Sequence, residues 1–176
     1  MENLDQESQI IKENQEISIS ELSPGQENIL FELRHQIDHR EGEKLKNEVF
    51  KYAHQKAGKI AFIAWEQKQP LGYIELKKEG DLPTDNLKKK IDISQLAHLA
   101  RIGILEEKRG RGFAQKLLDK AQKWAQKEGK IGLWLDYRQD NIPASKFYKK
   151  TGFLNIKEFQ DKKGHQRLLA VKKFTD

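Results

Sequence analysis

The chain has 176 residues, of which 36% are hydrophobic and 34% are charged, and it contains no cysteine. This length fits one domain of ordinary size, and the composition argues against collagen-like, coiled-coil and wholly disordered chains. The lack of cysteine excludes disulfide frameworks, thiolate metal sites and a cysteine nucleophile. The first residues are acidic and polar, unlike a signal peptide, and no apolar run approaches membrane-spanning length. We therefore expect a cytoplasmic protein.

The formal net charge of +6 is unevenly distributed along the chain. Residues 1–100 hold 14 Lys and Arg against 18 Asp and Glu, a net charge of −4. Residues 101–176 hold 19 against 9, a net charge of +10. A basic half can bind nucleic acid, an anionic membrane surface or a phosphorylated small molecule, so charge alone leaves these three alternatives open.

The N-terminal region divides into a tail and the start of a domain. Residues 1–14 are polar without clear periodicity, which predicts a loose tail and assigns residues 15–176 to one domain. The alternating residues 16–20 predict a short strand.

Two helices are predicted between residues 23 and 54. The sequence Ser23-Pro24-Gly25-Gln26 is typical of a helix start, with Ser23 as the N-cap, Pro24 at the first helical position and Gln26 placed to close a capping box. Apolar residues then recur at helical spacing, at Ile29, Leu30, Leu33 and Ile37. A second helix is predicted over residues 42–54, with these residues facing inward: Leu45, Val49, Phe50 and Ala53.

Residues 59–176 have the character of an α/β domain. Two apolar runs, 60–65 and 71–76, predict a hairpin, and the charged residues 77–92 predict a solvated loop without a clear element. Further strands are predicted over 96–105, 131–137, 153–159 and 166–173, with helices over 113–125 and 143–152. This order of strands and helices implies an α/β domain with a mixed sheet.

The segment Lys108-Arg109-Gly110-Arg111-Gly112-Phe113-Ala114 lies between a predicted buried strand and an amphipathic helix. Glycine lets a backbone approach a ligand closely, and the free N–H groups at a helix start favour a phosphate. Gln115 stands where a dinucleotide fingerprint needs its third glycine, and the segment lacks the Gly-Lys-Ser/Thr of a P-loop. The alternative interpretation is a basic turn that only connects the strand to the helix.

A second motif follows the next strand: Asn141-x-x-Ala144-x-x-Phe147-Tyr148-x-x-x-Gly152-Phe153. With Arg109-x-x-Gly112-x-Ala114 before it, the chain resembles the GCN5-related N-acetyltransferase (GNAT) superfamily, whose members move an acetyl group from acetyl-CoA to an amine. The resemblance covers residues 96–159. It implies a single-domain α/β fold, with a mixed central sheet of about seven strands, flanking helices, and two parallel strands splayed apart to admit the cofactor.

The resemblance also implies which residues bind acetyl-CoA. The backbone of residues 109–114 would hold the pyrophosphate, the strand residues 102–104 would hydrogen-bond the pantetheine arm, and Asn141 would contact the pantetheine or its phosphate end. The implied cofactor-binding residues are Ile102, Gly103, Ile104, Arg109, Gly110, Arg111, Gly112, Phe113, Ala114, Asn141 and, toward the 3′-phosphate, Lys146.

Two catalytic roles follow from the resemblance. Tyr148 would donate a proton to the departing thiolate, and a phenol with a pKa of about 10 suits a thiol with a pKa of about 8.5. The acceptor ammonium must lose a proton before it attacks, and His98 is the first candidate for the base. Glu75 or a chain of water molecules is the alternative. For Tyr148 and His98 the competing interpretation is ordinary packing, and for Glu75 it is a solvent-facing position.

The sequence therefore predicts an acetyl-CoA-dependent N-acetyltransferase that uses direct attack in a ternary complex, because no cysteine can carry the acetyl group. The acidic half favours a cationic primary amine such as a polyamine or an aminoglycoside, and a peptide or protein amine is also open. The alternatives are a basic nucleic-acid-binding module and a CoA-binding sensor of the same fold. We expect no metal, nucleic acid or membrane partner, and either a monomer or a homodimer.

Overall fold

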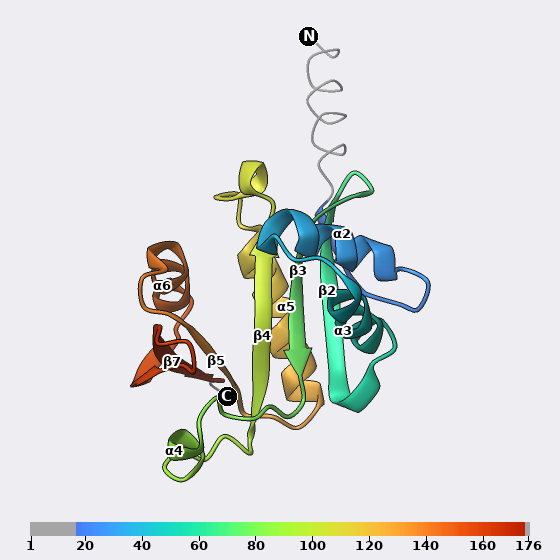
Figure 1. The fold of residues 1–176 in the computed structure, drawn as a ribbon. Helices are drawn as coiled ribbons and strands as arrows, with labels where there is room; N and C mark the ends of the chain where they lie inside the picture. Colours follow the sequence, from blue (N-terminus) through green and yellow to red (C-terminus); the bar gives the residue numbers. More distant parts are fainter. Residues whose placement is uncertain (1–16, 175–176) are drawn as a thin grey trace.

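A seven-stranded mixed sheet organises residues 17–174, the part of the chain that the computed structural model describes (Figure 1). Its strands follow the spatial order β1-β2-β3-β4-β5-β7-β6. The strands are β1 (Ile17–Glu21), β2 (Lys59–Glu66), β3 (Gln69–Lys77), β4 (Leu96–Ile104), β5 (Gly132–Arg138), β6 (Leu154–Gln160) and β7 (Gln166–Lys173). The helices are α2 (Glu27–Asp38), α3 (Glu43–Ala53), α4 (Asp85–Lys88), α5 (Phe113–Lys127) and α6 (Ile142–Lys150), with the 3-10 turns η1 (Lys56–Gly58) and η2 (Glu106–Lys108).

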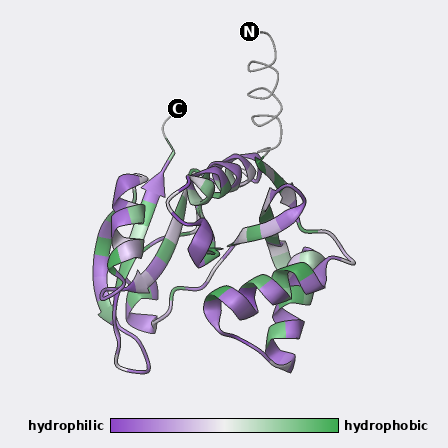
Figure 2. Ribbon diagram, turned by 90° about the horizontal axis from the view of Figure 1, so that it is seen from above, coloured by the Kyte–Doolittle hydropathy of each residue, from purple (hydrophilic) through white to green (hydrophobic). Residues whose placement is uncertain are grey.

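Helices cover both faces of this sheet. Helix α5 packs an apolar stripe, spaced three and four residues apart, on one face, while α2 and α3 pack on the other (Figure 1). Figure 2 shows hydrophilic and hydrophobic residues along each of these helices, as expected for elements with one buried side. The predicted α/β class, the mixed sheet and the order of elements are confirmed, and the predicted tail over residues 1–14 lies outside the described residues.

The parallel strands β4 and β5 separate along their length. They pair only at residues 96–98 with 132–134, after which β5 continues with β7 as its partner and β4 with β3 (Figure 1). A β-bulge leaves Ala100 unpaired opposite β3, and bulges increase the local twist of a strand. From residue 99 onward the edge of β4 that faces β5 has no strand partner, so the predicted splayed strands are confirmed.

The first helix starts later than the sequence predicts. Its N-cap is Gln26 and not Ser23, because Gly25 has a φ of 90°, which places Pro24 in a turn outside the helix. One predicted interaction is nevertheless present: the Gln26 side chain accepts a hydrogen bond from the Ser23 backbone N–H at 3.1 Å.

Two predictions about packing are also wrong. Phe50, expected to face inward, is 47% exposed and stacks on His54 with ring centroids 4.0 Å apart, while Tyr52 is buried in its place. The charged residues 77–92 do contain an element, the short helix α4, and their Leu82 and Leu87 are buried against Trp134. The helical spacing of apolar residues near position 50 was too weak a signal to predict that Tyr52 and not Phe50 faces inward. Leu82 and Leu87 stand isolated among charged residues, so no pattern predicted their burial.

No helix among residues 17–174 has the length and apolar character needed to cross a membrane. In the same part of the chain, no group of three or more His, Asp and Glu side chains is arranged to hold a metal ion.

The close approach of α2 to β4 depends on Gly103. A Cβ at this position would lie 2.7 Å from Ile37 Cγ2 and 3.1 Å from Tyr73 Cε1. We expect Gly103→Ala to lower the free energy of unfolding in urea by about 1–3 kcal/mol, because the added methyl overpacks this contact. In an Ile37→Ala background the cost should shrink, and an equal cost in both backgrounds would contradict the steric explanation.

Candidate active site between β4 and β5

The loop before α5 presents a row of free backbone donors at the mouth of the splayed strands. Within residues 17–174, the backbone N–H groups of residues 110–115 have no hydrogen-bond partner, since the first bond of the helix runs from Lys116 N–H to the Gly112 carbonyl. Gly110 and Gly112 have φ values of 76° and 82°, a region that glycine adopts without strain. Consecutive free N–H groups at a helix start make a concave site for an anion.

Side chains fix this loop to its neighbours. Lys108 and Arg111 both bind the Glu66 carboxylate, at 2.6 Å and 2.5 Å, and these hydrogen bonds, that of Lys108 above all, lower the pKa of Glu66. The Arg109 Nε donates to the Ile104 carbonyl at 3.2 Å, which ties the loop to the end of β4. One carboxylate thus faces two cations, so the loop keeps an excess of positive charge.

The edge of β4 offers backbone groups on the opposite side from β3. Ile102, Gly103 and Ile104 pair with β3 through one edge, and β5 has already diverged from the other. A chain carrying amide groups can add to such an edge as a further strand would.

Tyr148 of α6 packs on β5 beyond the point where this strand leaves β4. Asn141 begins this helix: its Oδ1 accepts the Ala144 N–H at 3.1 Å, a capping role that the sequence did not reveal. The Tyr148 ring is 8% exposed and packs on Tyr137 with centroids 5.1 Å apart. Burial raises the pKa of Tyr148, so its phenol keeps its proton. Tyr137 in turn donates to Asn155 Oδ1 at 3.0 Å, which fixes the ring that Tyr148 packs against.

His98 lies at the closed end of the cleft, where β4 and β5 still pair. Its ring stacks on Trp134 with centroids 3.9 Å apart and planes 9° apart, and its Nδ1 has no hydrogen-bond partner among residues 17–174. Burial, with the positive charges of Lys77 and Arg101, lowers the pKa of His98 to about 3. The ring is therefore neutral at pH 7 and a weak base.

Glu75 belongs to a buried ion network, and the interpretation of this residue as solvent-facing is wrong. Both Glu75 and Arg34 are 0% exposed, and Arg34 lies 3.2 Å from Glu75 while also binding Glu48 at 2.9 Å. Arg101 approaches Glu75 at 3.3 Å from β4. Burial raises the pKa of Glu75 against the opposite effect of the two guanidinium groups. No sequence pattern singled out Arg34, because a buried arginine inside a helix has no local signature.

A further charged pair, which the sequence analysis did not identify, lies on the face of β5 opposite to α5. Arg167 from β7 binds Asp136 through its Nε at 2.6 Å and its Nη2 at 2.5 Å. Strand pairing places these residues together although they are 31 positions apart. Only the alternation of residues along the predicted strand over 131–137 could have suggested that Asp136 points away from Tyr137.

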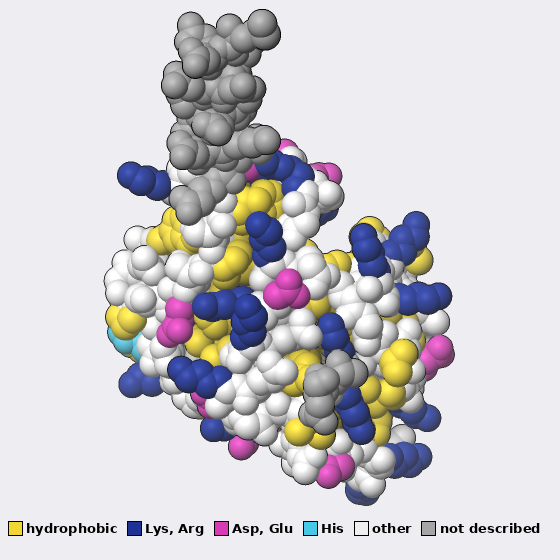
Figure 3. All heavy atoms as spheres, turned by 180° about the vertical axis from the view of Figure 1, so that it is seen from behind, with side chains coloured by type: hydrophobic (Ala, Val, Ile, Leu, Met, Phe, Trp, Pro, Cys, Tyr) yellow, Lys and Arg dark blue, Asp and Glu magenta, His cyan; other side chains and the backbone are white. Residues whose placement is uncertain are grey.

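The loop 109–114 follows the end of β4, Tyr148 packs on the β5 residue Tyr137, and His98 lies where β4 and β5 still pair. Lys146 is exposed on α6 and has no hydrogen-bond or ion-pair partner within residues 17–174. Seen from the α5 side, the surface is notched between the body of the sheet and the projecting part that carries α6, with Lys and Arg around the notch (Figure 3).

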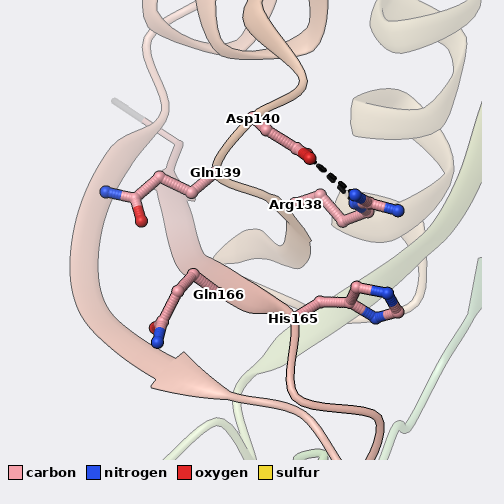
Figure 4. Close-up of a pocket in the computed structure, with 5 residues that line it drawn as sticks. All are labelled: Arg138, Gln139, Asp140, His165 and Gln166. Atoms are coloured by element: carbon pink, nitrogen blue, oxygen red, sulfur yellow. Dashed lines mark hydrogen bonds and ion pairs between the residues drawn. The ribbon is translucent and has the colours of Figure 1, made fainter.

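Two hollows lie elsewhere on the described part of the chain. One of about 370 Å³ sits at the ends of β5 and β7, lined by Arg138, Gln139, Asp140, His165 and Gln166 (Figure 4). Another of about 550 Å³ lies between α2 and α3, with Phe31 and Phe50 among its lining residues.

Comparison with known proteins adds to this geometry. The model of the acetyltransferase (GNAT) family matches residues 27–153. Streptothricin acetyltransferase from Escherichia coli is 35% identical over 60 residues, which are 34% of this chain and 34% of that protein. The match therefore spans about a third of that relative's length.

Solved structures share the fold at low sequence identity. NAA60 of Arabidopsis thaliana in complex with acetyl-CoA is 17% identical, with a TM-score of 0.71 over 90% of this chain and 99% of that one. The ribosomal-protein-S18-alanine N-acetyltransferase from Escherichia coli is 14% identical, with a TM-score of 0.69 over 92% and 96% of the two chains.

The depressed pKa of His98 predicts a pH dependence of stability. The folded pKa is about 3 and the ordinary value is 6.5, so the unfolded chain binds the additional proton between these pH values. The stabilisation that the neutral His98 contributes is complete above its ordinary pKa of 6.5. It is lost as the pH falls toward the pKa of about 3 in the folded protein. His98→Phe keeps a ring on Trp134 without a titrating group. Its urea unfolding free energy should fall less steeply than that of the wild type on acidification, and equal slopes would contradict the assignment.

Proposed function

The chain belongs to the acetyltransferase (GNAT) family, and we propose that it transfers the acetyl group of acetyl-CoA to a cationic primary amine by direct attack. The observation that supports this proposal is the separation of β4 from β5, which leaves an open strand edge near the free backbone donors before α5 and the buried phenol of Tyr148. The chain has no cysteine that could carry the acetyl group between two half-reactions.

The residues present fit acetyl-CoA. The free N–H groups of residues 110–115 suit the pyrophosphate, and Arg109 and Arg111 add positive charge beside them. The unpaired edge at Ile102, Gly103 and Ile104 suits the amides of the pantetheine arm. Asn141, with its Oδ1 engaged by the helix, keeps its amide N–H groups for a contact near the phosphate end, and Lys146 on the same helix suits the 3′-phosphate.

When bound, acetyl-CoA supplies an activated acetyl thioester, and Tyr148 supplies the proton that the leaving sulfur needs. Its buried phenol keeps that proton over the neutral pH range, because burial raises its pKa. The stack on Tyr137 and the hydrogen bond from Tyr137 to Asn155 hold the ring in one place.

Neither base candidate is well suited to take the proton of the acceptor. His98, with a pKa of about 3, accepts a proton only weakly, and Glu75 is held between Arg34 and Arg101. We infer that this proton leaves through water on the α2 side of the cleft, where the side chains of Arg101 and Asp38 are 35% and 25% exposed.

Relatives of different specificity share this fold, so the acceptor is assigned only by class. Streptothricin acetyltransferase, by its name, acts on a small molecule, and the acidic N-terminal half of the chain favours a cationic acceptor. We propose a small cationic amine over a protein N-terminus.

Acetyl-CoA binding tests the loop. Gly112→Asp adds a negative charge among the free N–H groups, and we expect it to raise the Kd for acetyl-CoA in calorimetry by at least about tenfold, because like charges brought together cost several kcal/mol. Gly129→Asp is the matched control, since Gly129 also has a positive φ of 75° and open space around it at the other end of α5. Equal affinity of the two variants would remove the loop from the site.

Thiol release tests Tyr148. Tyr148→Phe removes only the hydroxyl, and we expect turnover to fall by about 10²-fold or more while the Kd for acetyl-CoA stays the same, because the proton is needed only as the thiolate forms. The assay is release of free thiol at saturating acetyl-CoA across a panel of polyamines, aminoglycosides, amino acids and short peptides. Unchanged turnover would exclude Tyr148 as the acid.

A further inference from the structure

Asp136 is a mostly buried carboxylate on β5. It follows Trp134, the last β5 residue paired with β4, by two positions, so it stands in the segment where the two strands diverge. Strand alternation turns it away from Tyr137 and Tyr148, toward the face covered by α2 and α3.

One oxygen of Asp136 has room for a ligand. Arg167 holds Oδ2 through both its Nε and its Nη2, at 2.6 Å and 2.5 Å. Within residues 17–174, Oδ1 has no hydrogen-bond or ion-pair partner, and the side chain is 17% exposed. A carboxylate clamped on one oxygen and open on the other is a preorganised acceptor for a charge-assisted hydrogen bond.

Arg167 is shared with a second carboxylate, Asp161, whose Oδ2 lies 3.8 Å from its Nη1. The oxygens of Asp161 are already occupied by the N–H groups of Lys163 and His165 and by the His165 ring. One guanidinium therefore balances only part of the charge of two carboxylates. Because both oxygens of Asp161 already accept hydrogen bonds, the oxygen left for a ligand is Oδ1 of Asp136.

A second ion pair lies beside Arg167, in the hollow at the ends of β5 and β7. Arg138 and Asp140 form it at 2.5 Å, and Arg138 pairs in register with Arg167 (Figure 4). With Asp161 included, three carboxylates stand against two guanidinium groups, and this excess of negative charge favours a cation near Asp136.

We propose that Asp136, clamped by Arg167, binds a second cationic group of the acceptor, so that the substrate is a diamine, a polyamine or a basic amino sugar and not a monoamine. This inference rests on the proposed function. The nitrogen held by Asp136 stays protonated, because a carboxylate stabilises an ammonium, and a protonated nitrogen has no lone pair for attack. The amine that receives the acetyl group is therefore another nitrogen of the same molecule, carried to the β4 edge by the anchored one.

The test compares 1,4-diaminobutane with butylamine, two amines of equal chain length that differ in the second cation. We expect the wild type to acetylate the diamine with the higher kcat/KM. Asp136→Asn should lower kcat/KM for the diamine by about 10- to 100-fold and for butylamine by a much smaller factor, since one charge-assisted hydrogen bond contributes about 1.5–3 kcal/mol. Asp119→Asn, on the exposed surface of α5, makes the same change in net charge and should affect neither amine.

A purely structural role for the Asp136 and Arg167 pair has a different signature. It would lower thermal stability and reduce kcat/KM for both amines by the same factor, and that result would overturn the inference. A wild type without preference for the diamine would also overturn it, as would thiol release from neither amine in a protein that binds acetyl-CoA. Lack of acetyl-CoA binding in calorimetry would instead overturn the proposed function itself.

Discussion

The short parallel pairing of β4 with β5 is the constraint on which the active site depends. Three residue pairs hold the strands together at residues 96–98 and 132–134, and each strand then keeps only its outer neighbour, β3 or β7. The sheet therefore stays continuous, while the facing edges of β4 and β5 separate beyond His98 and Trp134. The stack of His98 on Trp134 lies at the vertex, and the bulge at Ala100 twists β4 just beyond it.

Each side of the opening is held by a different kind of interaction. The β4 side is fixed by the buried network of Arg34 and Glu75 and by the close contact of α2 at Gly103. The β5 side is fixed by its full pairing with β7 and by the aromatic contact between Tyr137 and Tyr148. Ionic and steric contacts hold the β4 side, while strand pairing and apolar packing hold the β5 side. The space between the two strands is therefore left open to a ligand.

The parts of the fold that the sequence predicts are those specified by local pattern. The alternating strands, the stripe of α5, the glycine loop and the motif that ends near Tyr148 each carry their signal within about 15 residues. The features that it misses depend on distant partners: the burial of Arg34 and the clamp of Arg167 on Asp136. No window along the chain contains both members of such a pair.

The carboxylate of Glu66 links the glycine loop to a hairpin that carries no motif. It stands at the end of β2, directly before Gln67 and Lys68, which turn the hairpin with φ values of 50° and 67°. Both values belong to a turn type that usually favours Asn and Gly, so this turn accepts other residues at some conformational cost. Asn and Gly would adopt the same φ values at lower cost, so the hairpin can be stabilised while Glu66 keeps its ion pairs with Lys108 and Arg111. The position of the glycine loop therefore depends in part on a hairpin outside the motif.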